Sequence, residues 1–200
     1  MACPEISCGE ENLRYPERSE GSGVVLKIAA NRSRQLGEVC ASTNMEFFMA
    51  IRNVVQEGDD VLRKKCFEVT AFDEKLGQLL DDMKETVRKE EGAGLAAPQV
   101  GILRRAVVVD VEEGFFELVN PVIVQEKGEQ TGWEGCLSVR GKRGIVTRPA
   151  TVKVEYFDRT GKKKKLAAHG FFARAICHEL DHLDGILYTD RAVRVERVKE

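Results

Sequence analysis

The sequence predicts an α+β fold in which antiparallel β-sheets surround a central helix and a long N-terminal helix packs outside. Three observations support this class. Apolar residues recur at helical spacing over 73–91, β-branched runs dominate 105–158, and a second helical pattern covers 173–185. A length of 200 residues suffices for one such domain, with or without an appendage.

Composition describes an ordinary globular protein without a strongly charged surface. Apolar residues make up 42% of the chain and charged residues 32%, and the net charge is −2. This balance gives no reason to expect DNA or a lipid surface as a partner. No apolar run approaches the ~18 residues of a membrane-spanning helix. The six cysteines form no C-x-x-C pair, so we expect reduced thiols in a cytoplasmic, monomeric protein.

Residues 1–48 differ in composition from the rest of the chain. They are rich in Glu, Arg, Ser and Gly, and Lys27 interrupts their only apolar patch. A secretory signal needs an uninterrupted apolar core and a transit peptide should contain few acids, so neither fits. We expect 1–48 to be a disordered or over-extended start, followed by one catalytic domain over 49–200. A regulatory or partner-binding tail is the alternative.

The long N-terminal helix is expected over Asp73–Glu91. The apolar residues that define it at helical spacing are Leu76, Leu79, Leu80, Met83 and Val87. Gly92 ends the pattern, and we assign the apolar face a packing role only. Upstream, Asp59-Asp60 is expected to cap a short helix.

Several segments are expected to be strands because β-branched and other apolar residues dominate them. They are 105–111, 115–125, 145–148, 151–158 and 166–169. Asn120-Pro121 predicts an edge or a bulge, and Asp158–Gly161 predicts a hairpin turn. The lysine run Lys162–Lys165 predicts a solvated strand edge, and 189–200 predicts an exposed tail.

Residues 92–101 contain too many small residues for a packing helix and are too apolar for an ordinary loop. Glycine is needed where the backbone approaches a ligand closely or takes a positive φ. A phosphate-binding loop does not fit, because no G-K-[S/T] follows. Gln99 is the functional candidate, since its neutral amide can donate to a developing oxyanion. An irregular connector is the alternative.

The helical pattern over 173–185 contains H-E-L-D-H, with histidines at positions 178 and 182, and ends at a capping Gly185. Residues four apart project from one helix face about one turn apart. Two imidazoles so placed can bind one divalent metal, and Glu179 beside the first can reach a bound water. The alternative is a buried helix with two hydrogen-bonded histidines and no metal, so a third ligand matters.

Three motifs occur in order along the chain: G-A-G-L-A-A-P-Q at 92–99, E-G-C-L-S at 134–138 and H-E-L-D-H at 178–182. Together they resemble the peptide deformylase family, over about 49–190. The resemblance implies that Cys136, His178 and His182 bind one divalent metal and leave a position open for water. It implies Fe(II), with Zn, Ni or Co in purified protein, whereas the ligand set alone fits zinc equally well.

The resemblance also implies the reaction. Such an enzyme removes the N-formyl group from N-formylmethionyl termini of newly made polypeptides and releases formate. Glu179 would be the general base toward the attacking water and would then protonate the leaving amine. The Gln99 amide and the Leu137 backbone N–H would stabilise the oxyanion.

The expected peptide path follows from the same resemblance. The peptide would lie extended and pair with backbone groups near Ala93, Gly94 and Gly135, where small residues allow close approach. The remaining expected contacts are a methionine pocket around Phe171, Ala175 and His178, and a loop through Arg143 along the path. An ion pair between Arg148 and Asp181, behind the ligands, would fix the metal helix.

Two other functions are possible alternatives. A zinc metalloprotease of the zincin type would match H-E-x-x-H-x-x-G, but Tyr188 stands where the third metzincin histidine should fall. The downstream acids Glu196 and Glu200 lie in a charged tail. A non-catalytic deformylase-like binder of formyl peptides could have lost Glu179 or Gln99, yet both are present. A transient ribosome contact is an additional expectation.

Overall fold

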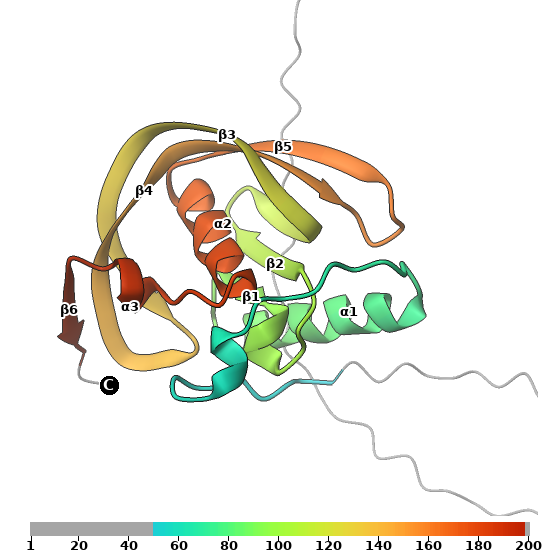
Figure 1. Ribbon diagram of the computed structural model, residues 1–200, viewed down its shortest axis with the longest axis horizontal. Coiled ribbons are helices and arrows are strands. Elements are labelled where there is room, and N and C mark those ends of the chain that lie inside the picture. The colour runs from blue at the N-terminus through green and yellow to red at the C-terminus, as the bar shows by residue number, and fades with distance from the viewer. Residues whose placement is uncertain (1–49, 199–200) are drawn as a thin grey trace, which may run out of the picture. The chain divides into compact units, whose positions relative to one another are not determined.

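The computed structural model describes residues 50–198, which form a six-stranded antiparallel sheet with accompanying helices (Figure 1). This agrees with the predicted α+β class. The predicted N-terminal extension, 1–48, lies outside the described residues. Within 50–198, no helix combines the length and apolar character needed to cross a membrane.

The elements are short 3-10 helices at Asp60–Arg63 and Ala97–Val100, α1 (Glu74–Lys89), β1 (Gly94–Ala96), β2 (Ala106–Val111), β3 (Gly114–Cys136), β4 (Val139–Phe157), β5 (Lys163–His169), α2 (Gly170–Leu183), α3 (Tyr188–Arg191) and β6 (Arg194–Arg197).

Helix α1 begins where the Asp73 side chain accepts a hydrogen bond from the Leu76 N–H at 3.1 Å. Its apolar face packs on β1 and β2 in one core cluster with Leu95 and Val108. The first described residues cross α1, because buried Asp82 accepts hydrogen bonds from the Arg52 guanidinium. The packing of α1 on β1 fixes the position of β1, the strand that precedes Gln99.

Strands β3 and β4 are long and curved, and they arch around α2 (Figure 1). The predicted irregularity at Asn120-Pro121 is confirmed: the β3–β4 register shifts between Val119 and Val122, and Asn120 has a φ of +48°. The sequence places the end of this strand at Gln125, but β3 continues to Cys136. The sequence of residues 126–135 is polar and contains glycine, which by itself is typical of a loop. The segment is extended because it pairs with β4.

The predicted exposed tail is wrong in part, because Arg194–Arg197 forms β6 and pairs with Lys142–Ile145 of β4. β5 pairs with β4 only over 151–157, so the first half of β4 has an edge that β5 leaves open. The alternation of apolar and charged residues over 193–196 (Val-Arg-Val-Glu) suits such an edge strand. The predicted lysine edge is found: Lys163–Lys165 of β5 are exposed, and two of these lysines pair with Glu155.

Helix α2 is enclosed by other elements along nearly all of its length. Every residue from Phe172 to Leu183 is buried, and the helix packs on β1, β2, β4 and β5. Ile176 and Leu183 join Val107 and Val152 in the largest apolar cluster of the described residues. Polar side chains on this helix therefore need partners, and they lie where the curved strands can supply them.

Gly185 ends the α2 segment at a position that only glycine fits. Its φ is +75°, and a Cβ there would lie 2.5 Å from the Arg63 carbonyl oxygen. We expect Gly185→Ala to lower the free energy of unfolding by about 1–3 kcal/mol, measured by urea denaturation. Gly101 is the matched control, because its φ of +80° is similar but a Cβ there would meet no atom within 4 Å. An equal loss for Gly101→Ala would contradict the role of the Arg63 contact.

Candidate active site

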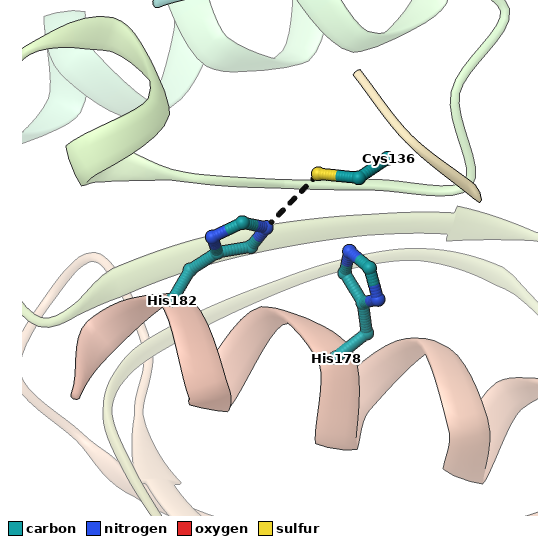
Figure 2. Close-up of side chains that lie close together, drawn as sticks. All are labelled: Cys136, His178 and His182. Atoms are coloured by element: carbon teal, nitrogen blue, oxygen red, sulfur yellow. Dashed lines mark hydrogen bonds between the residues drawn. The ribbon is translucent and has the colours of Figure 1, made fainter. Parts of the chain in front are cut away.

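Cys136, His178 and His182 meet between the end of β3 and α2, and their ligand atoms all lie within 4.8 Å of one another (Figure 2). The Cys136 Sγ lies 3.2 Å from the His182 Nε2. The two histidines occupy successive turns of α2, with ring centroids 5.0 Å apart. A thiolate and two imidazoles suit Zn²⁺ or Fe²⁺ and leave a fourth position free for a non-protein ligand. The donor set thus fits a catalytic divalent metal.

His178 is oriented by a carboxylate. Its Nδ1 lies 3.0 Å from the Glu134 Oε2, which leaves Nε2 for the cluster. Burial lowers the pKa of His178, but hydrogen bonds with Cys136 and Glu134 outweigh it and raise the pKa to about 10. The cluster therefore favours positive charge at this point, which a divalent ion would supply. In the described residues the buried His182 Nδ1 has no protein partner.

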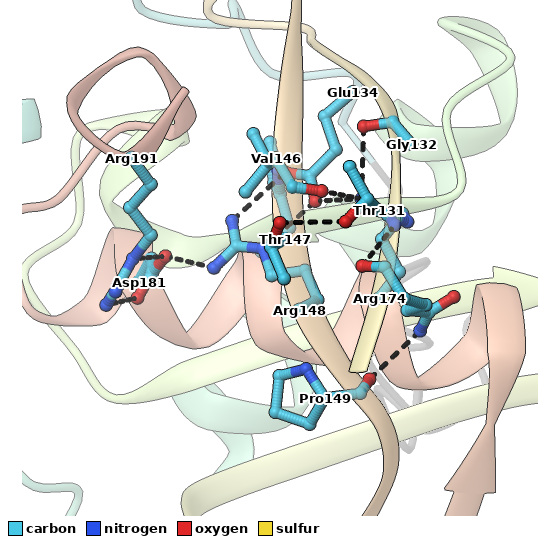
Figure 3. A network of polar contacts seen from close by, with 12 residues as sticks. Thr131, Gly132, Glu134, Val146, Thr147, Arg148, Pro149, Arg174, Asp181 and Arg191 are labelled. Atoms are coloured by element: carbon cyan, nitrogen blue, oxygen red, sulfur yellow. Dashed lines mark hydrogen bonds and ion pairs between the residues drawn. The ribbon is translucent and has the colours of Figure 1, made fainter. Parts of the chain in front are cut away.

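Glu134 is the centre of a buried ion-pair network (Figure 3). Arg148 donates to both of its oxygens, at 2.9 and 3.0 Å, and Arg174 donates to Oε1 at 2.8 Å. Burial raises the pKa of Glu134, but hydrogen bonds from His178 and Arg148 outweigh it and lower the pKa to about 2. The expected pair of Arg148 and Asp181 is present, and Arg191 also pairs with Asp181.

The sequence motifs assign no role to Glu134, although its carboxylate contacts His178, Arg148 and Arg174. Glu134 stands two residues before Cys136, but the β3–β4 register shifts between them, so regular strand alternation does not place the two side chains on one face. A buried carboxylate requires cationic partners. These partners, Arg148 and Arg174, come from β4 and α2, so the sequence around Glu134 does not indicate its contact with His178.

Glu179 is 4% exposed and lies against the Gly-rich segment. Burial raises the pKa of its carboxyl to about 7, so the group can accept and release a proton near neutral pH. A Cβ on Gly94 would lie 2.5 Å from the Glu179 Oε1. Gly94 is therefore a glycine because the Glu179 carboxylate occupies the space that a side chain would need.

We expect Gly94→Ala to fold but to lose about 10²-fold in kcat, because it displaces the Glu179 carboxylate, and a shift of about 1 Å can have that effect. Gly135→Ala is the control, since a Cβ at Gly135 meets no atom within 4 Å. Its effect should fall on KM and not on kcat. Steady-state kinetics of both variants check this, and a wild-type kcat for Gly94→Ala would contradict it.

Gln99 is held with its amide nitrogen toward Cys136. Its Oε1 accepts a hydrogen bond from the Ala96 N–H at 2.8 Å. This bond distinguishes the oxygen of the amide from its nitrogen. Its Nε2 lies 3.2 Å from the Ser138 Oγ and 3.5 Å from the Cys136 Sγ. The side chain is 1% exposed. A donor is thus fixed beside the cluster.

A cavity of about 250 Å³ opens onto the cluster. Most of the sequence-predicted site residues line it: Ala93, Gly94, Gln99, Gly135, Cys136, Leu137, Phe171, Ala175, His178 and Glu179. Phe171 is 62% exposed and lies at the mouth of the cavity. Arg143 is not part of the lining, and its guanidinium instead stacks on Trp133, which does line the cavity. His182 lies in the ligand cluster behind the lining.

Comparison with known proteins covers nearly all of the described residues. A family model described as polypeptide deformylase matches residues 51–198. The peptide deformylase of Thermoanaerobacter pseudethanolicus is 51% identical over 158 residues, which cover 76% of this chain and 99% of that protein. Peptide deformylase 1 of Bacillus subtilis is 52% identical over 145 residues, which cover 72% of this chain and 91% of that protein.

A solved structure agrees with these relatives. The peptide deformylase of Acinetobacter baumannii with Met-Ala-Ser bound has a TM-score of 0.68 at 35% identity, and the match covers 72% of this chain and 99% of that one. The matched range includes all three motifs that surround the cavity. On these grounds the chain belongs to the polypeptide deformylase family, hydrolases that remove the N-formyl group from newly made polypeptides.

Proposed function

We propose that this chain deformylates N-formylmethionyl peptides at the cluster of Cys136, His178 and His182, with α2 as the central metal-binding helix and α1 outside it. The observation that carries the proposal is the convergence of these three ligand atoms within 4.8 Å, beside Glu179 and the Gln99 amide. A divalent metal bound there, expected to be Fe(II) and replaceable by Zn, Ni or Co, would supply Lewis-acid activation of water and of the formyl oxygen.

Glu179 is the proton carrier in this proposal. Its carboxylate removes a proton from the attacking water and then delivers it to the amine of the departing peptide. The pKa of about 7 supports both halves of that role, because the group is neither a strong nor a very weak acid. The close fit to Gly94 limits where the carboxylate can lie.

Gln99 and Leu137 stabilise the charge that develops on the formyl oxygen. The Gln99 Nε2 is a fixed donor next to Cys136, and the Leu137 backbone N–H follows Cys136 directly in the chain. Both residues line the cavity. Donors that are already oriented need no reorganisation when the charge forms.

The peptide binds extended along β1. β1 pairs with β2 through one edge, and Ala93, Gly94 and Gly135 line the cavity where an added strand would lie. The methionine side chain enters beside Ala175 and His178, with Phe171 at the mouth. The Met-Ala-Ser bound to the related Acinetobacter baumannii protein supports a peptide of this type.

The test is formate release from formyl-Met-Ala-Ser by the full chain, purified without oxygen and loaded with Fe(II). The matched control is acetyl-Met-Ala-Ser, which differs from the substrate by one methyl group. We expect turnover of the formyl peptide only. A metal-loaded protein that releases no formate would instead support a non-catalytic binder.

We further propose that the protein works as a cytoplasmic monomer that meets nascent chains, with a transient ribosome contact through its C-terminal segment. Sedimentation velocity of the full chain, alone and with 70S ribosomes, tests both parts. A stable dimer, or no cosedimentation at low salt, would contradict the respective part.

A further inference from the structure

Two exposed aromatic side chains line the cavity: Phe171 from α2 and Trp133 from β3, which is 42% exposed. Trp133 stands three residues before Cys136 on β3, which is about 10 Å of strand at most, because the β3–β4 register shifts between Glu134 and Cys136. A peptide with its formyl group at the cluster would therefore need about three residues to reach Trp133. A formyl-methionine derivative without further residues would stop short of it.

Trp133 is covered on one side by a cation. The Arg143 guanidinium carbon lies 4.2 Å from the centroid of the Trp133 ring, within the range of a cation–π contact. Arg143 comes from β4, close to Trp133 across the β3–β4 ladder, in which Trp133 pairs with Ile145. Arg143 thus contacts the wall of the cavity through Trp133.

The cation is held in turn by the C-terminal strand. Glu196 of β6 stands directly opposite Arg143 in the β4–β6 register, with its Oε2 3.3 Å from the Arg143 Nη2. The other oxygen of Glu196 pairs with Arg194 at 2.6 Å. Backbone bonds on either side, from Val193 to Ile145 and from Val198 to Gly141, fix β6 on β4.

We propose that Glu196 is a positioning residue that holds Arg143 against Trp133, so that the C-terminal strand sets the affinity of the cavity for peptides long enough to reach this wall. The inference rests on the proposed function, because it concerns the same substrate path. Exposed ion pairs and cation–π contacts are individually modest, so the expected effect is a few-fold change.

Trp133 is the only tryptophan in the sequence, so fluorescence excited at wavelengths that tyrosine does not absorb reports on this wall alone. The experiment compares wild type, Glu196→Gln and the control Glu155→Gln, which removes a cross-strand carboxylate paired with Lys163 and Lys165 on the β4–β5 side. We expect Glu196→Gln to increase iodide quenching of Trp133. It should raise KM for formyl-Met-Ala-Ser about two- to fivefold, with unchanged kcat and unchanged KM for formyl-Met amide.

Three results would overturn the proposal. They are unchanged iodide quenching in Glu196→Gln, an equal KM change for both substrates in Glu196→Gln, and the same KM change in the control Glu155→Gln. Failure of the proposed function is separately visible, because the quenching measurement needs no turnover. If the wild type released no formate, binding of Met-Ala-Ser against methionine amide, followed by Trp133 fluorescence, would decide the same question. If Glu196→Gln loses affinity for Met-Ala-Ser by twofold or more and keeps its affinity for methionine amide, the role of Glu196 is supported.

Discussion

Glu179→Gln is expected to lower kcat for formate release by about 10²–10⁴-fold while the protein still binds one metal ion. Glutamine keeps the shape of the side chain next to Gly94 but cannot accept the proton of the attacking water. Metal ligation by Cys136, His178 and His182 does not involve this carboxylate in the proposed site. Kinetics and metal analysis on the same preparation check both parts.

Two outcomes would count against this role. Near-wild-type kcat in Glu179→Gln would mean that another group carries the proton. Loss of metal would mean that the carboxylate supports the ligand cluster. Glu134→Gln provides the contrast, because Glu134 hydrogen-bonds to His178, and its replacement should weaken metal binding first.

Gln99→Ala is expected to lower kcat by about 10²–10³-fold, because it removes a fixed donor from the position where the proposed reaction would form an oxyanion. The same change leaves the buried Ala96 N–H without its acceptor, so it should also lower the free energy of unfolding by about 1–3 kcal/mol. Gln99→Glu keeps an acceptor for Ala96 and lacks the donor, but it also buries a carboxylate without a cationic partner, so only its kcat, and not its stability, is diagnostic. Kinetics of both variants and urea denaturation of Gln99→Ala test this.

Ser138→Ala is the matched control for Gln99, since it removes one partner of the Gln99 amide and leaves the Ala96 bond in place. Its kcat should stay within about tenfold of wild type. If Gln99→Glu retained full activity, or if Ser138→Ala were as impaired as Gln99→Ala, the donor role of Gln99 would be wrong.

The parts of the fold that the sequence predicts well are those with local periodicity. The ranges expected for the helices, 73–91 and 173–185, overlap α1 and α2 because apolar spacing and end residues both act locally. The bulge at Asn120 is likewise a local effect of Asn-Pro chemistry. The three ordered motifs brought together Gln99, Cys136 and the two histidines through resemblance to a family, which no local pattern could have done.

The parts that the sequence missed depend on pairing between distant segments. Residues 126–135 are extended because β4 lies beside them, and 194–197 form a strand because β5 leaves an edge of β4 open. The contact of Gly94 with Glu179 joins segments 85 positions apart, so no sequence window could contain it. The ion pairs of Glu134 also depend on distant segments, because their partners Arg148 and Arg174 come from β4 and α2.

Binding of one divalent metal by Cys136, His178 and His182 is the central claim about this protein. It is tested most directly by titrating the metal-free full chain with Co²⁺ without oxygen, and recording the thiolate-to-cobalt absorption of wild type and Cys136→Ser. We predict that the absorption saturates at one equivalent in the wild type and is lost in Cys136→Ser. A band that persists in Cys136→Ser, or a wild type that binds no stoichiometric cobalt, would contradict it.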